Sequence, residues 1–384
     1  MNSTHFYNKK LGILGGGQLG KMLCIAAAPW HLNTFILDPD ENCPASLVCK
    51  NVHKGNFTDY ETVYRFGQLV DIITIEIENV NVEALFKLKE EGKVVYPDPA
   101  ALQLIQDKGL QKEFYAKNKL STSAFALYES KQQVLDNIKN GKIKFPFVQK
   151  TRKAGYDGKG VAVVNSEKEL GLLLDGACVI EEKINFKKEL SVIAARDTQG
   201  HIKCFDIVEM VFDEQANLVT SLLCPAQVST IIAKKAEELA TATIKAFGIT
   251  GILAVELFLD ANDNILINEV APRPHNSGHH TIEACVTSQY EQHLRAVLGL
   301  PLGSTEIIMP SVMINLLGAA GYSGNAIYEG IDKCMEVEGA KFHIYGKAQT
   351  KPFRKMGHVT IIDKSAESAI KKAEFVQKNL KIIA

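Results

Sequence analysis

Short apolar runs alternate with helical patterns over the N-terminal quarter of the chain. The runs at 11–14, 33–37, 70–77 and 94–96 predict strands, and the pattern at 18–28 predicts a helix that stops near Pro29. Strands separated by helices are typical of a parallel, doubly wound sheet, in which ligands bind beyond the carboxyl ends of the strands. We therefore expect the glycine turn at 15–17, Asp38 and the acidic segment 76–79 to lie along that edge.

From about residue 99 the pattern becomes richer in strands. A charged helical stretch at 103–118 precedes predicted strands at 147–150, 161–164, 178–184 and 190–195. One hairpin is predicted from 201–212 and 218–223, a helix from 231–247, and a second hairpin from 251–259 and 264–270. After Gly303, strands at 312–317 and 359–362 and a closing helix at 366–380 indicate a smaller unit.

These patterns divide the chain into three parts. We predict an α/β protein with an N-terminal Rossmann-like parallel-sheet domain at 1–105, a central α+β domain at 106–300 and a small C-terminal β-rich domain at 301–384. A length of 384 residues suits two or three domains.

Composition and charge argue against several classes of protein. The net charge of −1 lacks the excess of Lys and Arg that is typical of a nucleic-acid binder. No stretch approaches the roughly 20 apolar residues of a membrane span, and the first residues do not resemble a signal peptide. The eight cysteines form no CxxC pair, so we expect reduced thiols in a cytoplasmic protein.

The glycine turn near the N-terminus is the first candidate binding motif. Gly15, Gly17 and Gly20 match the GxGxxG spacing, and Asp38 ends the next predicted strand. Dinucleotide-binding enzymes use this arrangement, because glycines let the backbone approach a phosphate at a helix N-terminus. The same turn can bind other phosphate-bearing ligands or simply form a tight corner, so a nicotinamide-dependent oxidoreductase stays open on this motif.

A second glycine-rich loop follows the predicted strand that ends at Lys150. Residues 150–160 contain four cations and three glycines, which suits a loop closing over a polyphosphate. They do not form a P-loop, because GxxxxGK[ST] is absent. The alternative is a solvated basic hairpin.

Two carboxylates interrupt the apolar runs of the last central hairpin. If its strands pair through the turn at 260–263, Glu256 and Glu269 share one face near one level. With Asn268 they offer hard oxygen ligands for Mg²⁺, which would bridge to the phosphates of a nucleotide. The alternative is that each Glu is a surface residue paired with a Lys or Arg.

The segment 271–280, APRPHNSGHH, follows this hairpin directly. Its prolines stiffen a turn that carries Arg273 and His275 beside the predicted metal site. A transition-metal site is disfavoured by the arginine, so we interpret Arg273 and His275 as a site for a small oxyanion.

Taken together, these motifs resemble the ATP-grasp superfamily, and within it the N5-carboxyaminoimidazole ribonucleotide synthase family. The resemblance runs nearly from end to end. It rests on GGGQLGKM at 15–22, EIENV at 76–80, GYDGKG at 155–160, NEVAPRPHNSGH at 268–279, and YGK and RKMGH within 345–358.

The resemblance implies an ATP-dependent carbon–nitrogen ligase of purine biosynthesis. ATP would phosphorylate bicarbonate to carboxyphosphate, which breaks down to CO₂, and the N5 amine of 5-aminoimidazole ribonucleotide would capture it. ADP and phosphate would leave, and Mg²⁺ would be required. A cytoplasmic homodimer without nucleic-acid or membrane partners is implied as well.

The resemblance also implies residue roles. Arg273, His275 and Lys347 would be catalytic, and Glu256 and Glu269 would bind the metal. The ribonucleotide would contact Gln18, Glu78, Tyr156, Asp157, Lys347 and Arg354. ATP would contact Lys108, Lys150, Gly155, Tyr156, Asp157, Gly158, Lys159, Gly160, Val161, Glu181, Glu182, Lys183, Ile184, Glu189, Phe212, Asn268 and Glu269.

Three positions depart from the family's usual pattern. Lys108 stands where Arg is common, and Phe212 stands where a histidine usually contacts the nucleotide. Lys21 replaces an Arg, which we interpret as a change tolerated at the surface.

Three other functions each account for part of the sequence. A Rossmann dehydrogenase explains residues 1–40 and nothing after Lys150. A formate-using glycinamide ribonucleotide transformylase would share the paired Glu but not the segment Arg273–His279. A nucleotide-sensing remnant would bind ATP without turnover.

Overall fold

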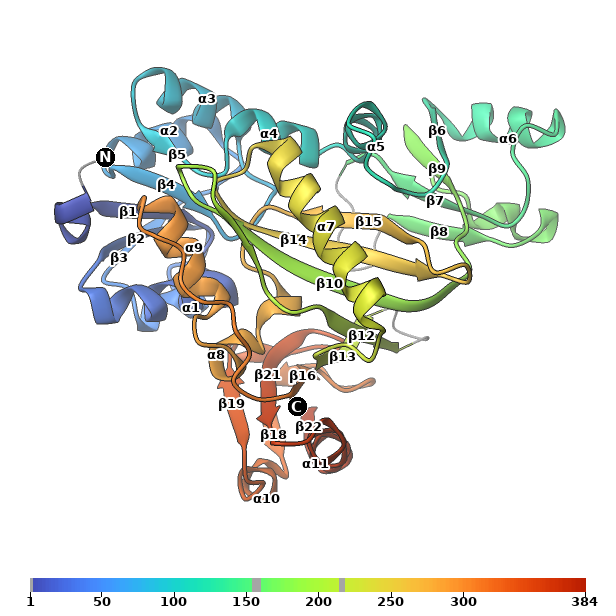
Figure 1. Ribbon diagram of the computed structural model, residues 1–384. Coiled ribbons are helices and arrows are strands. Elements are labelled where there is room, and N and C mark those ends of the chain that lie inside the picture. The colour runs from blue at the N-terminus through green and yellow to red at the C-terminus, as the bar shows by residue number, and fades with distance from the viewer. Residues whose placement is uncertain (1–2, 154–159, 214–217) are drawn as a thin grey trace.

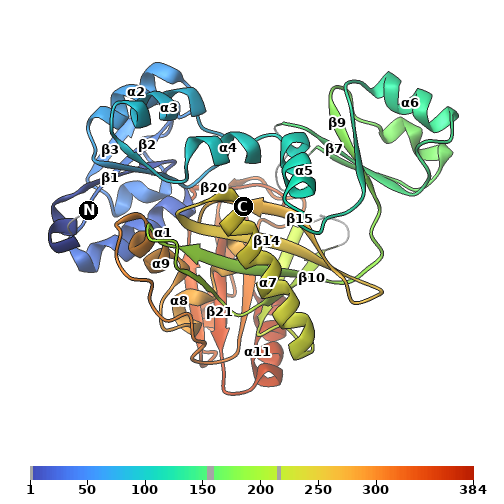
Figure 2. The same ribbon diagram turned by 45° about the horizontal axis from the view of Figure 1, so that its top comes forward.

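The computed structural model describes residues 3–153, 160–213 and 218–384. An N-terminal parallel sheet, a small antiparallel lobe and a large central sheet surround the middle of the molecule (Figures 1 and 2). The small lobe projects to one side in both views, and the C-terminal helix lies at the opposite end of the central sheet.

The N-terminal sheet has five parallel strands in the order β3-β2-β1-β4-β5. The strands are β1 (Lys10–Leu14), β2 (Asn33–Asp38), β3 (Asn51–Lys54), β4 (Ile72–Ile75) and β5 (Val94–Val95), and the helices are α1 (Gln18–Ala27), α2 (Tyr60–Gln68) and α3 (Val82–Glu90). This confirms the doubly wound sheet. The sequence did not predict β3, because this half-buried edge strand is mostly polar.

The charged stretch at 103–118 is two helices, so the prediction of one helical segment was wrong. Helix α4 (Pro99–Ile105) ends before Asp107, which is the N-cap of α5 (Lys108–Lys117). The Asp107 carboxylate accepts hydrogen bonds from the N–H groups of Gly109 and Leu110, and it also binds both Nε and Nη2 of Arg152 at 2.9 Å. A buried carboxylate with these donors fixes the break between the helices.

The small lobe is an antiparallel sheet in the order β6-β9-β7-β8, covered by one helix. Its elements are β6 (Phe125–Tyr128), α6 (Lys131–Lys139), β7 (Phe147–Thr151), β8 (Val161–Val164) and β9 (Cys178–Glu182). Val134 of the helix packs with Phe147 and Val164 in a separate small core. The lobe therefore has its own packing and meets the rest of the protein mainly at one edge (Figure 2).

The central sheet has nine strands, eight of them in the order β15-β14-β10-β12-β13-β16-β21-β19, with β11 on β10. Its central-region elements are β10 (Phe186–Arg196), β11 (Ile202–Cys204), β12 (Val208–Asp213), β13 (Leu218–Cys224), α7 (Thr230–Phe247), β14 (Gly251–Asp260) and β15 (Ile265–Ala271). The apolar face of α7 packs on this sheet to form the largest core cluster. Both predicted hairpins are confirmed, although the first strand of the earlier one is interrupted between β11 and β12.

The three main strands of the C-terminal region extend the central sheet, and β17–β20 and β18–β22 form two small sheets beside it. Strand β16 (Ser311–Leu317) pairs with β13, and β21 (Lys355–Ile362) pairs with β16 and with β19 (Ala340–Ile344). The remaining elements are β17 (Gly324–Asn325), β18 (Ile327–Glu329), α10 (Ile331–Met335), β20 (Gln349–Thr350), α11 (Ala366–Asn379) and β22 (Lys381–Ile383). Hydrogen bonds therefore cross the predicted boundary at residue 300.

Two helices after β15, α8 (Thr281–Ala284) and α9 (Gln289–Val297), join the two large sheets. The buried ring of His293 contacts the Thr74 hydroxyl of β4 through Nε2 at 2.8 Å and accepts from the N–H of Ile252 through Nδ1. Tyr290 and Leu294 pack into the core under α1. No helix within the described ranges is long and apolar enough to cross a membrane.

Asp107→Ala is expected to lower the free energy of unfolding by about 3 kcal/mol. The substitution removes the cap of α5 and leaves the half-buried guanidinium of Arg152 without its main carboxylate. Urea denaturation followed by circular dichroism measures the change. The matched control is Asp98→Ala at the more exposed N-cap of α4, where a loss of about 1 kcal/mol is expected. Equal losses in the two variants would contradict this explanation.

Candidate active site

The carboxyl ends of the parallel strands carry acidic side chains, as the sequence predicted, but these fold back onto the glycine turn. Asp38 accepts a hydrogen bond from the N–H of Gly16 at 2.7 Å. Glu76 accepts from the N–H groups of Gly17 and Gly20 at 2.9 and 2.8 Å. The N-terminus of α1 thus holds the protein's own carboxylate where a Rossmann enzyme would hold a pyrophosphate. This geometry argues against the oxidoreductase.

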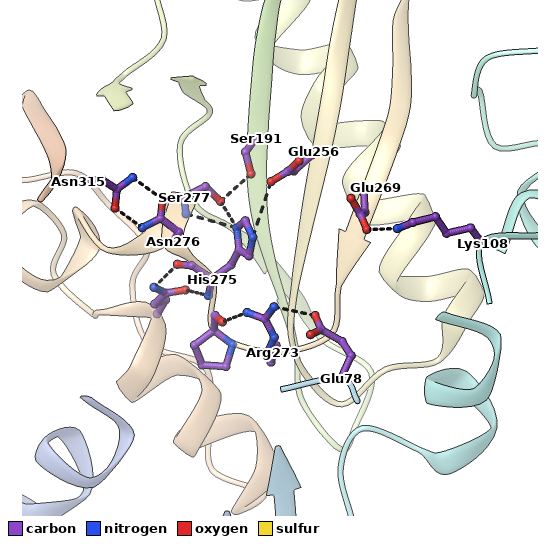
Figure 3. A network of polar contacts seen from close by, with 12 residues as sticks. Glu78, Lys108, Ser191, Glu256, Glu269, Arg273, His275, Asn276, Ser277 and Asn315 are labelled. Carbon is purple, nitrogen blue, oxygen red and sulfur yellow. Dashed lines mark hydrogen bonds and ion pairs between the residues drawn. The ribbon is translucent and has the colours of Figure 1, made fainter. Parts of the chain in front are cut away.

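A pair of carboxylates lies on β14 and β15 at the centre of the molecule (Figure 3). Glu256 and Glu269 are direct cross-strand partners, which confirms the predicted pairing. The register then shifts so that Leu257 faces Ile267, and Asn268 is the extra residue of a bulge. A bulge can direct two consecutive side chains into one site, which regular alternation along a strand forbids.

Negative charge is concentrated around this pair. The pKa of Glu256 is raised to about 8, mainly by burial and then by the neighbouring carboxylates of Glu269 and Glu189. Burial also raises the pKa of Glu189, on β10, to about 7. A bound cation would relieve this repulsion. Within the described ranges, however, no three His, Cys, Asp or Glu side chains are placed to hold a metal by themselves.

Two lysines face these acidic groups from the small lobe and its adjoining helix. Lys108, the first residue of α5, contacts Glu269 Oε1 through Nζ at 2.5 Å (Figure 3). Lys150, near the end of β7, donates to Asn268 Oδ1 at 2.9 Å and lies 3.2 Å from Glu181 Oε1. The structure therefore brings together predicted phosphate-binding and metal-binding residues from separate parts of the chain.

Lys112 is a buried residue of this site that the sequence reasoning missed. Its Nζ donates to Glu181 Oε2 at 2.9 Å and to the hydroxyls of Thr122 and Ser123. Burial by itself would raise the pKa of Glu181, but the charges of Lys150 and Lys112 and the Ser123 hydroxyl lower it to about 2. Glu181 thus turns inward and anchors Lys150, although we expected it to line the adenine. The only sequence signal was the spacing of Lys112, four residues after Lys108.

The turn after β15 places Arg273 and His275 beside the carboxylate pair (Figure 3). Arg273 Nη2 lies 2.9 Å from Glu78 Oε1, and its Nη1 donates to the carbonyl of Pro274. His275 Nε2 lies 3.7 Å from Glu256 Oε1. Burial lowers the pKa of His275 well below its ordinary value, and the charges of Arg273 and Lys355 lower it further.

Side-chain amides fix this turn to its surroundings. The Gln289 amide bonds both the N–H and the carbonyl of His275 at 2.8 Å. Asn276 and Asn315 exchange two hydrogen bonds (Figure 3). Asn315 also donates to the carbonyl of Val219. The turn is therefore held against three elements, β13, β16 and α9.

The predicted phosphate-binding residues of the C-terminal region lie in the connection between β19 and β21. Lys347 donates to the carbonyl of Lys355 at 2.8 Å and lies over the ring of Tyr345, and Arg354 donates to the carbonyl of Gln349. Lys21 of α1 donates to the carbonyl of Ile344 at 3.0 Å. Lys21 is half-buried and joins α1 to the end of β19, a contact that the sequence did not predict.

The remaining predicted residues divide into two groups. Gly155, Tyr156, Asp157, Gly158 and Lys159 lie outside the described residues. Gly160 accepts from the N–H of Thr151, and Val161 begins β8. Glu182 ends β9 with Lys183 and Ile184 after it, Phe212 packs half-buried on β12, and Gln18 begins α1.

Comparisons with known proteins agree with this architecture. Residues 8–106 match the ribonucleotide synthetase preATP-grasp domain, 113–290 match the ATP-grasp domain, and 311–372 match the phosphoribosylaminoimidazole carboxylase C-terminal domain. The N5-carboxyaminoimidazole ribonucleotide synthase of Bacillus subtilis is 36% identical over 92% of this chain and 91% of its own. This chain belongs to the N5-carboxyaminoimidazole ribonucleotide synthase family. The synthase is therefore an ATP-dependent, ATP-grasp ligase of purine biosynthesis, as the motifs implied.

Solved structures of similar proteins extend the likeness over the whole synthase. The N5-carboxyaminoimidazole ribonucleotide synthetase of Thermotoga maritima has a TM-score of 0.90 and 40% identity, covering 98% of this chain and 99% of that one. The Aspergillus clavatus synthase in complex with ADP and 5-aminoimidazole ribonucleotide has a TM-score of 0.89 and 31% identity, with 97% and 98% coverage.

Some relatives are longer than the synthase. The phosphoribosylaminoimidazole carboxylase of Candida albicans is 38% identical over 96% of this chain, which spans 66% of that protein. The remaining third of that carboxylase has no counterpart in this comparison.

The raised pKa of Glu256 predicts that stability of the synthase falls as pH rises. A carboxyl whose pKa is higher in the folded than in the unfolded state stabilises the fold when protonated. Its contribution is complete below the ordinary value of 4.5 and is lost as pH rises through about 8. Without Mg²⁺ and nucleotide, we expect the unfolding free energy of the wild type to fall relative to Glu256→Gln by about 1 kcal/mol or more over this interval.

Denaturant titrations at several pH values measure this difference. Glu90→Gln, at an exposed position on α3, is the matched control and is expected to follow the wild type at every pH. Parallel curves for the wild type and Glu256→Gln would show that Glu256 does not titrate as described.

Proposed function

We propose that the synthase carboxylates the N5 amine of 5-aminoimidazole ribonucleotide with bicarbonate through a carboxyphosphate intermediate. ATP transfers its terminal phosphoryl group to bicarbonate, and carboxyphosphate breaks down to CO₂ and phosphate. The amine nitrogen then bonds to the carbon of CO₂ and loses a proton, which gives the carbamate. The observation that carries this proposal is the position of Arg273 and His275, directly beside the paired Glu256 and Glu269.

ATP would bind between the small lobe and the central sheet. Lys108 and Lys150 already lie against Glu269 and Asn268, so a triphosphate placed there would meet two cations. Glu189, on the neighbouring strand, would accept from the ribose hydroxyls. The segment from Glu182 to Ile184 would line the adenine, and the loop 155–161 would cover the phosphates. Positioning and charge neutralisation supply most of the catalysis of phosphoryl transfer.

Glu256 and Glu269 fit a magnesium site. They are direct cross-strand partners. Burial, and then repulsion from Glu269, raises the pKa of Glu256. Asn268 supplies a further oxygen beside the two carboxylates. These oxygen donors suit Mg²⁺, which keeps water and phosphate oxygens as its other ligands. When bound, the ion would neutralise charge on the phosphates of ATP.

Bicarbonate would occupy the space beside Arg273 and His275. The guanidinium can present two parallel N–H groups to a carboxylate or phosphate, which a lysine cannot do. Glu78 now contacts this guanidinium at 2.9 Å and would orient it. Excluding water from the site matters, because carboxyphosphate is short-lived in water.

The ribonucleotide would bind between the N-terminal sheet and the β19–β21 connection. Lys347 and Arg354 would hold its 5′-phosphate, and Gln18, Glu78, Tyr156 and Asp157 would contact the rest. Lys21 supports this arrangement, because its bond to Ile344 holds the connection near α1. The synthase would act as a homodimer in the cytoplasm, which stays a prediction from the resemblance.

Two departures from the family pattern leave the proposal intact. Lys108 keeps a positive charge at the place of the usual Arg and contacts Glu269 directly. Phe212 cannot make the polar contact of the usual histidine, so its contribution to ATP binding would be packing alone.

The experiment that tests the proposal is ADP release by the purified synthase with Mg-ATP and bicarbonate, with and without 5-aminoimidazole ribonucleotide. We expect release to depend on the ribonucleotide. Stimulation by formate and glycinamide ribonucleotide instead would assign the transformylase reaction. ATP binding without ADP release under any condition would indicate the nucleotide-sensing remnant.

In the same assay, Glu269→Ala is expected to reduce turnover by at least about a hundredfold, because it removes a metal ligand. Near-normal ADP release from a folded Glu269→Ala variant would remove Glu269 from the site.

Lys347→Ala is expected to raise the apparent KM for the ribonucleotide by about tenfold and to change the KM for ATP by less than about twofold. The loss of one charged hydrogen bond to a phosphate accounts for this size. Steady-state kinetics with each substrate varied in turn measure both constants. Lys351→Ala, an exposed lysine on the same connection, serves as the control. A larger effect on ATP would place the 5′-phosphate elsewhere.

A further inference from the structure

Two buried serines connect to the ring of His275 on the side that faces away from Glu256. Ser277 Oγ lies 2.9 Å from His275 Nδ1, and Ser191 Oγ lies 2.8 Å from Ser277 Oγ (Figure 3). Each serine has only 1% of its surface exposed. Ser191 lies on β10 and is the direct cross-strand partner of Glu256 on β14. The contacts that run from Ser191 through Ser277 and His275 therefore return to the same level of the sheet.

A backbone contact indicates which ring nitrogen carries the proton. The N–H of Ser277 donates to His275 Nδ1 at 3.3 Å. A backbone N–H can only donate, so Nδ1 must be an acceptor without a proton. The Ser277 hydroxyl then donates to Nδ1 as well, and the Ser191 hydroxyl donates to Ser277 Oγ. The proton of the neutral ring is therefore on Nε2, toward Glu256 and the bicarbonate site.

We propose that Ser277 and Ser191 are positioning residues that hold His275 in the Nε2–H tautomer, so that it donates a hydrogen bond to the oxygens of carboxyphosphate. This inference rests on the proposed function. The ring then has no accepting nitrogen toward the substrates, so His275 is not the base that takes the proton of the amine. As the amine nitrogen bonds to CO₂, one C–O π bond opens and the released proton passes to the phosphate formed from carboxyphosphate.

The tautomer can be observed directly by NMR of the full-length protein labelled with ¹⁵N in its histidine rings. The resonances of His275 are assigned by their loss in His275→Gln. In the wild type we expect an unprotonated Nδ1 and a protonated Nε2. Ser277→Ala keeps the longer backbone contact at 3.3 Å but loses the hydroxyl at 2.9 Å, so we expect a mixture with the other tautomer. A protonated Nδ1 in the wild type would overturn the proposal, and so would an unchanged tautomer in Ser277→Ala.

The kinetic test separates positioning from a loss of structure. Ser277→Ala is expected to lower kcat for ribonucleotide-dependent ADP release by about tenfold and to leave the KM for ATP within about twofold. Ser277→Thr, which keeps the hydroxyl, should restore most of the rate. Ser191→Ala should lower kcat by about threefold, and it provides the test if Ser277→Ala does not fold. An unchanged kcat in both alanine variants would overturn the proposal.

Ser311→Ala is the matched control, because Ser311 is a fully buried serine whose hydroxyl lacks a hydrogen-bond partner among the described residues. It should keep both the His275 spectrum and the rate of the wild type. If the wild type released no ADP with the ribonucleotide, the proposed function would fail, whereas the tautomer is read without any substrate. The two failures are therefore distinguishable.

Discussion

The repulsion between carboxylates on adjacent strands is the constraint on which the rest of the site depends. Glu256 and Glu269 stand opposite each other, and Glu189 adds a third acidic group nearby. Such crowding is unfavourable unless cations face it. Lys108 and Lys150 supply them from the small lobe and its adjoining helix, and Lys150 is itself fixed by Glu181. The Lys108–Glu269 ion pair and the Lys150–Asn268 hydrogen bond thus also hold α5 and the small lobe against the central sheet.

Lys112 and Glu181 form a buried ion pair behind Lys150, which Glu181 also contacts. Both side chains are nearly fully buried. Lys112 Nζ also donates to the hydroxyls of Thr122 and Ser123, and the Ser123 hydroxyl donates to Glu181 Oε2. A buried ion pair gains little net free energy of folding, because removing two charges from water offsets their attraction. Its value here is geometric, since it keeps Lys150 pointed at Asn268.

The continuous central sheet explains how residues distant in sequence act together. Strand β16 joins the edge of β13 and carries Asn315, which fixes the turn of Arg273 and His275. Strand β21 follows it and carries the end of the connection that holds Lys347. Because hydrogen-bonded strands move little relative to one another, the sheet fixes the separation between the residues proposed to bind bicarbonate and those proposed to bind the 5′-phosphate. The glycine turn contributes from the other side by presenting α1, whose Lys21 reaches the same connection.

The sequence by itself determined part of the strand and helix pattern, the parallel N-terminal sheet, the hairpin that pairs Glu256 with Glu269, and the family. These follow from local periodicity and from motifs long enough to be specific, such as residues 268–279. Only the tertiary structure decided that Glu76 occupies the glycine turn, that Asn268 sits in a bulge, that Lys112 meets Glu181, and that Ser277 meets Ser191. Each of these depends on a contact between segments that are far apart, or on a one-residue shift in strand register. Neither leaves a periodic signal in the chain, because the same residue types at the same spacing also occur on solvated surfaces.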